Sequence, residues 1–113
     1  MTTNELRKNM FSIGRAVLRK YTMKGMTQAE ADGKSHVLAV VEDWINSYQF
    51  ETIKKVIGYL KNESKIIKNN QKDIEMEFES TKDKEYQKEL TEEMTKWCMA
   101  DKILNNILFE IGA

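Results

Sequence analysis

The sequence predicts an all-α protein of four helices, the last two of which form a long antiparallel hairpin that resembles a coiled coil. Three observations predict this fold. Proline is absent and only five glycines occur in 113 residues, so few positions interrupt a helix. Apolar residues recur at alternating steps of four and three in two segments, residues 53–78 and 86–111. Folded back on each other, the two segments bring these stripes face to face.

The hairpin prediction rests on the register of the two stripes. The first consists of Ile53, Ile57, Leu60, Ser64, Ile67, Gln71, Ile74 and Phe78, and the second of Tyr86, Leu90, Met94, Trp97, Asp101, Leu104, Leu108 and Ile111. Antiparallel pairing places Ile57 opposite Leu108 and continues without a gap along both stripes. We therefore expect helices over about 50–79 and 82–111, with the tip of the hairpin near Lys82.

Two shorter helices are expected before the hairpin. Thr2 and Glu5 match a capping box, in which a Thr hydroxyl and a Glu carboxylate accept from free backbone amides, so the first helix should run to about Met23. The two N-terminal helices are too short to cover the whole hairpin. We therefore expect them to pack at the apolar base of the hairpin and the tip of the hairpin to protrude.

The start of the second helix has two interpretations. Thr27 and Glu30 form another capping box, which predicts a helix start near Thr27. Gly33 either breaks that helix or lets another helix approach closely. The main helix is expected over about Ser35–Ser47. Its core residues should be Val37, Leu38, Val40, Val41, Trp44 and Ile45.

Composition and length limit the class of protein. The chain is 41% hydrophobic and 32% charged, which is typical of a water-soluble helical protein, and its 113 residues fit a single helical domain over 1–113. No apolar run approaches the ~20 residues needed to cross a bilayer, and the N-terminus lacks the apolar core of a signal peptide. We therefore expect no membrane contact and a cytoplasmic location.

The sequence offers little catalytic chemistry. It contains one cysteine, Cys98, which we expect to be buried and inert, and one histidine, His36. One His and one Cys cannot form a zinc set or a supported Cys–His pair. Gly33 is followed by Lys and Ser as in a phosphate-binding loop, but Gln28 stands where that motif needs a glycine. We predict no enzyme activity, no cofactor and no metal.

Two layers of the predicted seam between the hairpin helices are polar. Ser64 is expected to face Asp101, and Gln71 to face Met94. Polar seam residues lower stability but fix the register, because a slipped alignment would bury them without partners. The alternative is that Asp101, with Ser64 and Lys68 nearby, contacts a ligand or a partner.

Charge is balanced in total but divided along the chain. Residues 1–25 contain six Lys or Arg and one acidic residue, whereas residues 74–113 contain ten acidic residues and five lysines. Lys8, Arg15 and Arg19 fall on one side of the first predicted helix and form a basic ridge. This ridge is the best candidate in the sequence for contact with a nucleic acid.

The leading functional hypothesis is a non-enzymatic protein-binding module that acts by occupying the surface of its target. The composition resembles that of small phage or mobile-element accessory proteins. By this analogy the chain is expected to inhibit or bridge a host protein. Candidate anchors are the aromatic residues Phe50, Tyr59 and Tyr86, which we expect to point outward, together with the basic ridge. The apolar base of the hairpin exceeds the need of one two-helix seam, so a homodimer is also expected.

Two alternatives belong to other classes of function. The protein is a nucleic-acid-binding accessory protein that uses the basic face of the N-terminal helix, or an oligomeric sponge that holds an anionic small ligand between subunits. Salt separates the first alternative from the leading hypothesis, because phosphate binding weakens steeply as salt rises.

Overall fold

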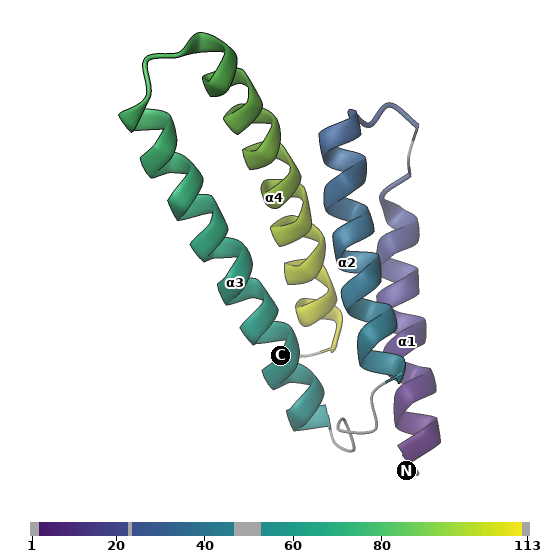
Figure 1. Ribbon diagram of the computed structural model, residues 1–113. Coiled ribbons are helices and arrows are strands. Elements are labelled where there is room, and N and C mark those ends of the chain that lie inside the picture. Colours follow the sequence, from purple (N-terminus) through teal and green to yellow (C-terminus); the bar gives the residue numbers. More distant parts are fainter. Residues whose placement is uncertain (1–2, 23, 47–52, 112–113) are drawn as a thin grey trace.

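The computed structural model contains four α-helices that run alternately up and down (Figure 1). It describes the backbone of residues 3–22, 24–46 and 53–111, and the side chains of 8–9, 12–22, 24–43 and 54–111. The helices are α1 (Thr3–Lys20), α2 (Gln28–Asn46), α3 (Ile53–Ser80) and α4 (Lys84–Ile111). The predicted all-α arrangement with a long α3–α4 hairpin is confirmed.

Helix α4 is the central element of the fold. It packs against α2, α3 and α1, and α1 packs in addition against α2. In Figure 1, α3 lies on one side of α4 and the N-terminal helices lie on the other, while the α3–α4 turn extends beyond the N-terminal end of α2. The molecule is elongated, with extents of 55 × 28 × 21 Å.

The boundaries of α2 differ from the main prediction. The helix is continuous from Gln28, so the expected start near Ser35 is wrong and the capping box marks the true start. The Glu30 amide donates to Thr27 Oγ1 at 3.2 Å, and the Thr27 amide donates to Glu30 Oε1 at 3.1 Å. These two bonds satisfy amides that have no partner within the helix.

Gly33 continues α2 because it lies against the backbone of α4. A Cβ atom at this position would be 2.3 Å from the Lys96 carbonyl oxygen and 3.0 Å from Met99 Cβ. The second interpretation of Gly33, close approach of another helix, is therefore correct. Only a residue without a side chain allows the two helices to come this near.

Helix α1 ends earlier than expected. Its last residue is Lys20, and the Tyr21 amide donates to the Leu18 carbonyl at 3.2 Å, a tightened final turn. Gly25 then adopts a φ of 81°, which reverses the chain towards α2. This end of α1 is tied to α4, since Asn106 Nδ2 donates to the Tyr21 hydroxyl.

The tip of the hairpin is held by its own side chains. Asp83 Oδ1 accepts from the Glu85 amide at 3.0 Å and caps α4. Gln87 Nε2 donates to the Thr81 carbonyl at 3.0 Å across the turn. The turn therefore connects α3 and α4 in one defined geometry.

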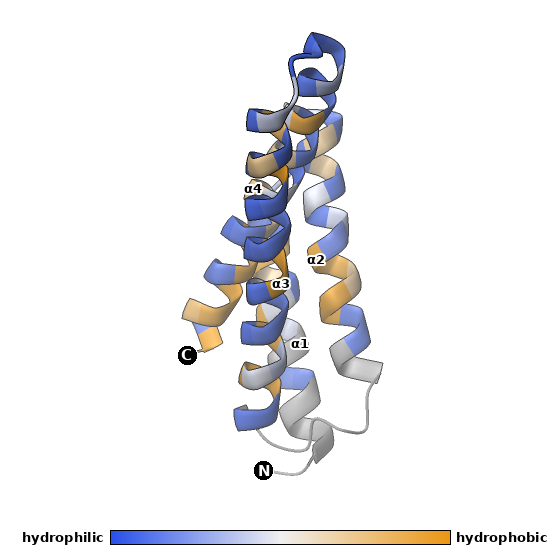
Figure 2. Ribbon diagram, turned by 60° about the vertical axis from the view of Figure 1, so that its left-hand side comes forward, coloured by the Kyte–Doolittle hydropathy of each residue, from blue (hydrophilic) through white to orange (hydrophobic). Residues whose placement is uncertain are grey.

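The core lies where α4 meets the other three helices (Figure 2). Leu60 of α3 and Leu104 of α4, opposite each other in the predicted register, are both 0% exposed. The buried cluster consists of Val17, Leu18, Val37, Val40, Val41, Val56, Leu60, Ile67, Ala100, Ile103, Leu104 and Ile107. Leu38 is 39% exposed, so its predicted place in the core is wrong. The side chains of Trp44 and Ile45 lie outside the described residues.

Helix α4 buries a wider stripe than the predicted seam. Ala100, Ile103 and Ile107 are fully buried although they lie outside the stripe that faces α3. The reason is that α4 contacts α2 and α1 as well as α3. Within the described residues, no helix has both the length and the apolar character needed to span a bilayer.

Candidate partner-binding site

The distal half of the hairpin contains an apolar groove between α3 and α4. Ile74 and Phe78 of α3 and Leu90 and Met94 of α4 contribute its apolar side chains, and its volume is about 480 Å³. Leu90 is buried at 5% exposure, whereas Phe78 is 41% exposed. Leu90 thus forms a buried apolar base of the groove, and the Phe78 ring is accessible at its side.

The two walls of this groove differ in chemistry. Glu75 and Glu79 line it from α3, and Thr91 and Thr95 line it from α4. Both Thr hydroxyls donate to the backbone carbonyl four residues earlier, at 2.8 and 3.0 Å. Both hydroxyl donors are therefore already used within α4, and neither Thr carries a charge. The α3 wall of the groove is thus acidic and the α4 wall is neutral.

Cys98 closes the groove towards the base of the hairpin. Its side chain is exposed, so the prediction that this thiol is buried is wrong. Gln71, one of the predicted polar seam residues, is half-buried and its Nε2 donates to Cys98 Sγ at 3.5 Å. No local pattern indicated this arrangement, because Cys98 lies beside the half-buried Trp97 in an apolar segment.

The other two polar seam residues lie within the helix contacts. Ser64 is buried at 6% exposure, and Asp101 is half-buried. Asp101 Oδ1 is a buried atom without a hydrogen-bond partner. The native register thus already leaves one Asp101 oxygen unpaired, so a role of these residues in fixing the alignment stays a prediction.

The predicted aromatic anchors are distributed unevenly. Tyr59 is half-buried and packs against the core, so the expectation that its ring points outward is wrong. Tyr86 is 39% exposed and its hydroxyl donates to the Glu77 carboxylate, a bond that raises the pKa of Tyr86. Phe50 lies outside the described residues. Tyr86 is thus the predicted aromatic anchor that the structure places at the distal surface.

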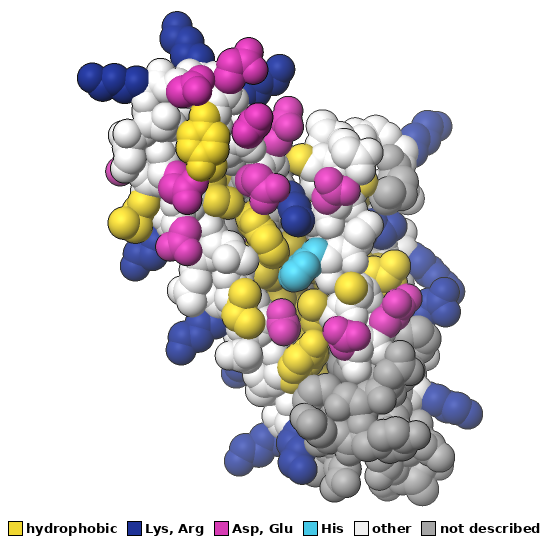
Figure 3. Space-filling model, in the orientation of Figure 1, with side chains coloured by type: hydrophobic (Ala, Val, Ile, Leu, Met, Phe, Trp, Pro, Cys, Tyr) yellow, Lys and Arg dark blue, Asp and Glu magenta, His cyan; other side chains and the backbone are white. Residues whose placement is uncertain are grey.

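The predicted basic ridge lies on α1, away from the groove. Lys8, Arg15 and Arg19 are all exposed. Their neighbour Lys20 lies 3.8 Å from Glu110 of α4, measured from Nζ to Oε1. Figure 3 shows Lys and Arg side chains along both lateral edges of the molecule, with Asp and Glu gathered on the face between them.

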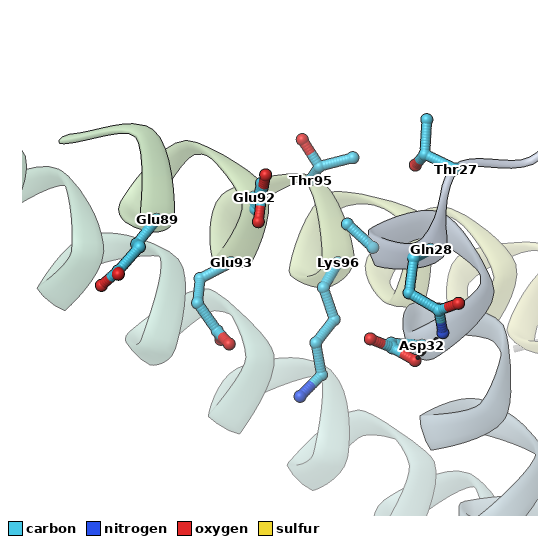
Figure 4. Close-up of a pocket in the computed structure, with 9 residues that line it drawn as sticks. Thr27, Gln28, Asp32, Glu89, Glu92, Glu93, Thr95 and Lys96 are labelled. Carbon is cyan, nitrogen blue, oxygen red and sulfur yellow. Dashed lines mark hydrogen bonds between the residues drawn. The ribbon is translucent and has the colours of Figure 1, made fainter. Parts of the chain in front are cut away.

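The acidic residues of α4 line a polar hollow beside the start of α2 (Figure 4). Its volume is about 580 Å³. Asp32 from α2 and Glu89, Glu92 and Glu93 from α4 supply carboxylates, while Lys96 supplies one positive charge. This charge balance disfavours an anionic ligand. Nowhere in the part of the chain that the structure describes do three or more His, Cys, Asp or Glu side chains lie close enough together to hold a metal ion.

His36 occupies the contact between α2 and α4. Its ring lies edge-on to Trp97 with centroids 4.9 Å apart, and Nε2 is buried without a hydrogen-bond partner. Burial lowers the pKa of His36, and Lys96 lowers it further, while Glu63 partly opposes them. The neutral imidazole is therefore the form that fits this contact.

Acidification is expected to destabilise the fold through His36. Above a pH of ~6.5 the imidazole is neutral in both states and has no effect. As the pH falls through that value, the unfolded chain takes up the proton before the folded chain does, so the free energy of unfolding decreases. Urea unfolding at pH 7.5 and 5.5 should show this loss. The His36→Phe variant retains an aromatic ring and should lose less stability, whereas an equal loss in both proteins would contradict the assignment.

Comparisons with protein-family models, with curated proteins and with solved structures find no match for this chain. The function is therefore inferred from the surfaces described above. The apolar groove, the polar hollow and the basic edges differ in the kind of molecule each would attract.

Proposed function

We propose that the protein is a non-enzymatic binding module that holds a segment of another protein in the groove between α3 and α4. The observation that carries this proposal is the apolar groove on a hairpin arm, with Phe78 exposed and Leu90 buried beneath it. Exposed aromatic side chains beside a firm apolar floor are typical of binding hot spots.

The shape of the arm favours a helical partner segment. Two antiparallel helices leave a straight groove between them, and an amphipathic helix can lay its apolar face into such a groove. The Asp83 cap and the Gln87 bond across the turn define the geometry of the distal end. A preformed groove requires little ordering on binding, which favours affinity.

The charges of the walls favour a partner with basic flanks. Glu75 and Glu79 place two carboxylates on one side of the groove, and the Thr side opposes them with no charge. A Lys or Arg beside the apolar anchors of the partner would meet these carboxylates at the rim. Such rim pairs mainly raise the association rate and select the partner.

Replacing Phe78 with alanine should weaken partner binding about 30-fold or more, which corresponds to the ~2 kcal/mol that defines a hot spot. Met76 offers a matched control, because it lies on the same helix, is 62% exposed and does not line the groove. Affinity for the partner recovered from native cells should be unchanged in Met76→Ala. Equal losses in both variants, or no loss in either, would contradict the groove as the contact surface.

Cys98 provides a way to identify what occupies the groove. It is the one cysteine of the chain, and it is exposed at the groove. A thiol-directed photo-crosslinker at Cys98 should couple to the bound segment, and coupling should fall in Phe78→Ala but not in Met76→Ala. If the crosslinked product is a second copy of this chain, the expected homodimer forms through this groove, and light scattering should give twice the monomer mass.

An anionic sponge would need a site other than the polar hollow, such as the expected one between subunits. The polar hollow of the chain contains four carboxylates and one lysine, so a bound anion would be repelled there. Inhibition or bridging of a host protein is compatible with the groove, because a filled groove blocks the segment it holds.

A further inference from the structure

Between residues 54 and 72, one edge of α3 consists entirely of lysines. At about 100° per residue, Lys54, Lys61, Lys65, Lys68 and Lys72 fall within a sector of ~60°, and no other residue between 54 and 72 shares that sector. All five are exposed. At 1.5 Å per residue this lysine edge is about 27 Å long. In Figure 3, Lys and Arg side chains follow the α3 side of the molecule.

The charge in the middle of the lysine edge has no acidic neighbour along α3, whereas Lys72 at its end has Glu75 three positions away. Neither Lys61 nor Lys68 has an Asp or Glu three or four positions away, where a helical ion pair would form. The five lysines take part in no ion pair among the described residues. The pairs Lys61–Lys65 and Lys68–Lys72 place like charges four residues apart, which destabilises a helix. An external anion would remove this repulsion.

The fold keeps three of the acidic residues of α4 away from the lysine edge. Glu89, Glu92 and Glu93 line the polar hollow beside α2, on the other side of α4 from α3. Figure 3 shows the acidic side chains on the face between the two basic edges. Interactions between exposed charges are largely screened beyond ~8 Å at physiological salt, so the separated acids leave the field of the edge in place.

We propose that the lysine edge is a binding site for the phosphate backbone of a nucleic acid, independent of base sequence. A straight line of cations matches a line of phosphates, and lysine binds phosphate as a point charge without reading bases. A membrane-binding helix would need an accessible apolar face opposite its lysines, whereas Val56, Leu60 and Ile67 of α3 are buried in the core. The site is separate from the groove and from the basic ridge of α1.

Salt dependence of oligonucleotide binding tests this site. Fluorescence anisotropy with a labelled DNA duplex of about 20 base pairs should show binding that weakens as salt rises. With five phosphate contacts the logarithmic slope is about −4.5, so affinity falls about 500-fold between 50 and 200 mM salt. The triple variant Lys61→Gln, Lys65→Gln, Lys68→Gln should bind more weakly at each salt concentration, and its slope should be shallower by about 2.7.

The tip of the hairpin supplies a control with the same change in net charge. Lys82, Lys84 and Lys88 are exposed there, and their replacement by glutamine should change affinity less than about twofold. Circular dichroism should show the same helix content in both triple variants, since Gln and Lys have similar helix propensities. An equal loss of affinity in the tip variant would overturn the proposal. The proposal would also be overturned if Arg15→Gln and Arg19→Gln abolished DNA binding while the α3 triple variant retained it. Binding to anionic lipid vesicles but not to DNA would overturn it as well.

Discussion

Replacing Gly33 with alanine is expected to lower the free energy of unfolding by about 3 kcal/mol, near the upper end for overpacked sites. The added Cβ would meet the Lys96 carbonyl oxygen at 2.3 Å, and that atom belongs to the backbone of α4. It cannot turn away as a flexible side chain can, so α2 and α4 would have to separate. Urea unfolding followed by circular dichroism measures this loss.

Gly58 provides the matched control for this prediction. It lies within α3, and a Cβ atom there would meet nothing within 4 Å. Alanine at position 58 should therefore stabilise the protein by about 1 kcal/mol, which is the difference in helix propensity between the two residues. If Gly33→Ala were also stabilising, the close contact between α2 and α4 would be wrong.

Truncation of the central hairpin pair is the second change with a large expected effect. Leu60 and Leu104 face each other in the predicted register and are both fully buried. Each change to alanine should cost about 2–5 kcal/mol, because it removes apolar contacts and leaves a cavity. A domain of this size is stable by about 5–15 kcal/mol, so either change is a large fraction of the total.

A double-mutant cycle tests the register itself. If Leu60 and Leu104 are in contact, the effects of the two substitutions should fail to add by about 0.5–3 kcal/mol. Ile67 and Ile107 are also fully buried, but the register separates them by about nine residues, or ~13 Å. Their effects should add to within about 0.5 kcal/mol. Coupling in the second pair but not in the first would show that the helices are aligned differently.

Much of the hairpin was predictable because its signals are local or repeat along the chain. The step of four and three requires only a helix and a facing stripe, so α3 and α4 lie within three residues of their predicted bounds. The Thr27 capping box likewise marked the true start of α2, since its two hydrogen bonds join residues three positions apart.

Predictions that depended on the neighbours of a helix were less successful. Leu38 and Tyr59 were assigned to the core and to the surface by type and spacing, and the structure places each of them differently. A helical stripe gives the direction of burial only when the number of partner helices is known. Helix α4 has three partners and buries Ala100 and Ile107 outside the predicted seam.

The candidate sites were less accessible from the sequence than the fold. Phe78 and Leu90 are far apart in the chain and become walls of one groove only when the hairpin closes. The lysine edge of α3 is visible as a spacing, but its significance depends on where the acids of α4 lie. Both features are properties of two or more helices considered together.

By itself, the sequence determined that the chain is helical, that its last two helices form a long hairpin and where the Thr27 capping box lies, because propensity, capping and a repeated stripe act between residues close in sequence or at a regular spacing. The tertiary structure decided that α4 is central, that Gly33 is a point of helix contact, and that Cys98 is exposed at a groove. These features depend on which faces of different helices come into contact. The same local sequence pattern is compatible with several helix packings, and only the packing of the whole core selects one of them.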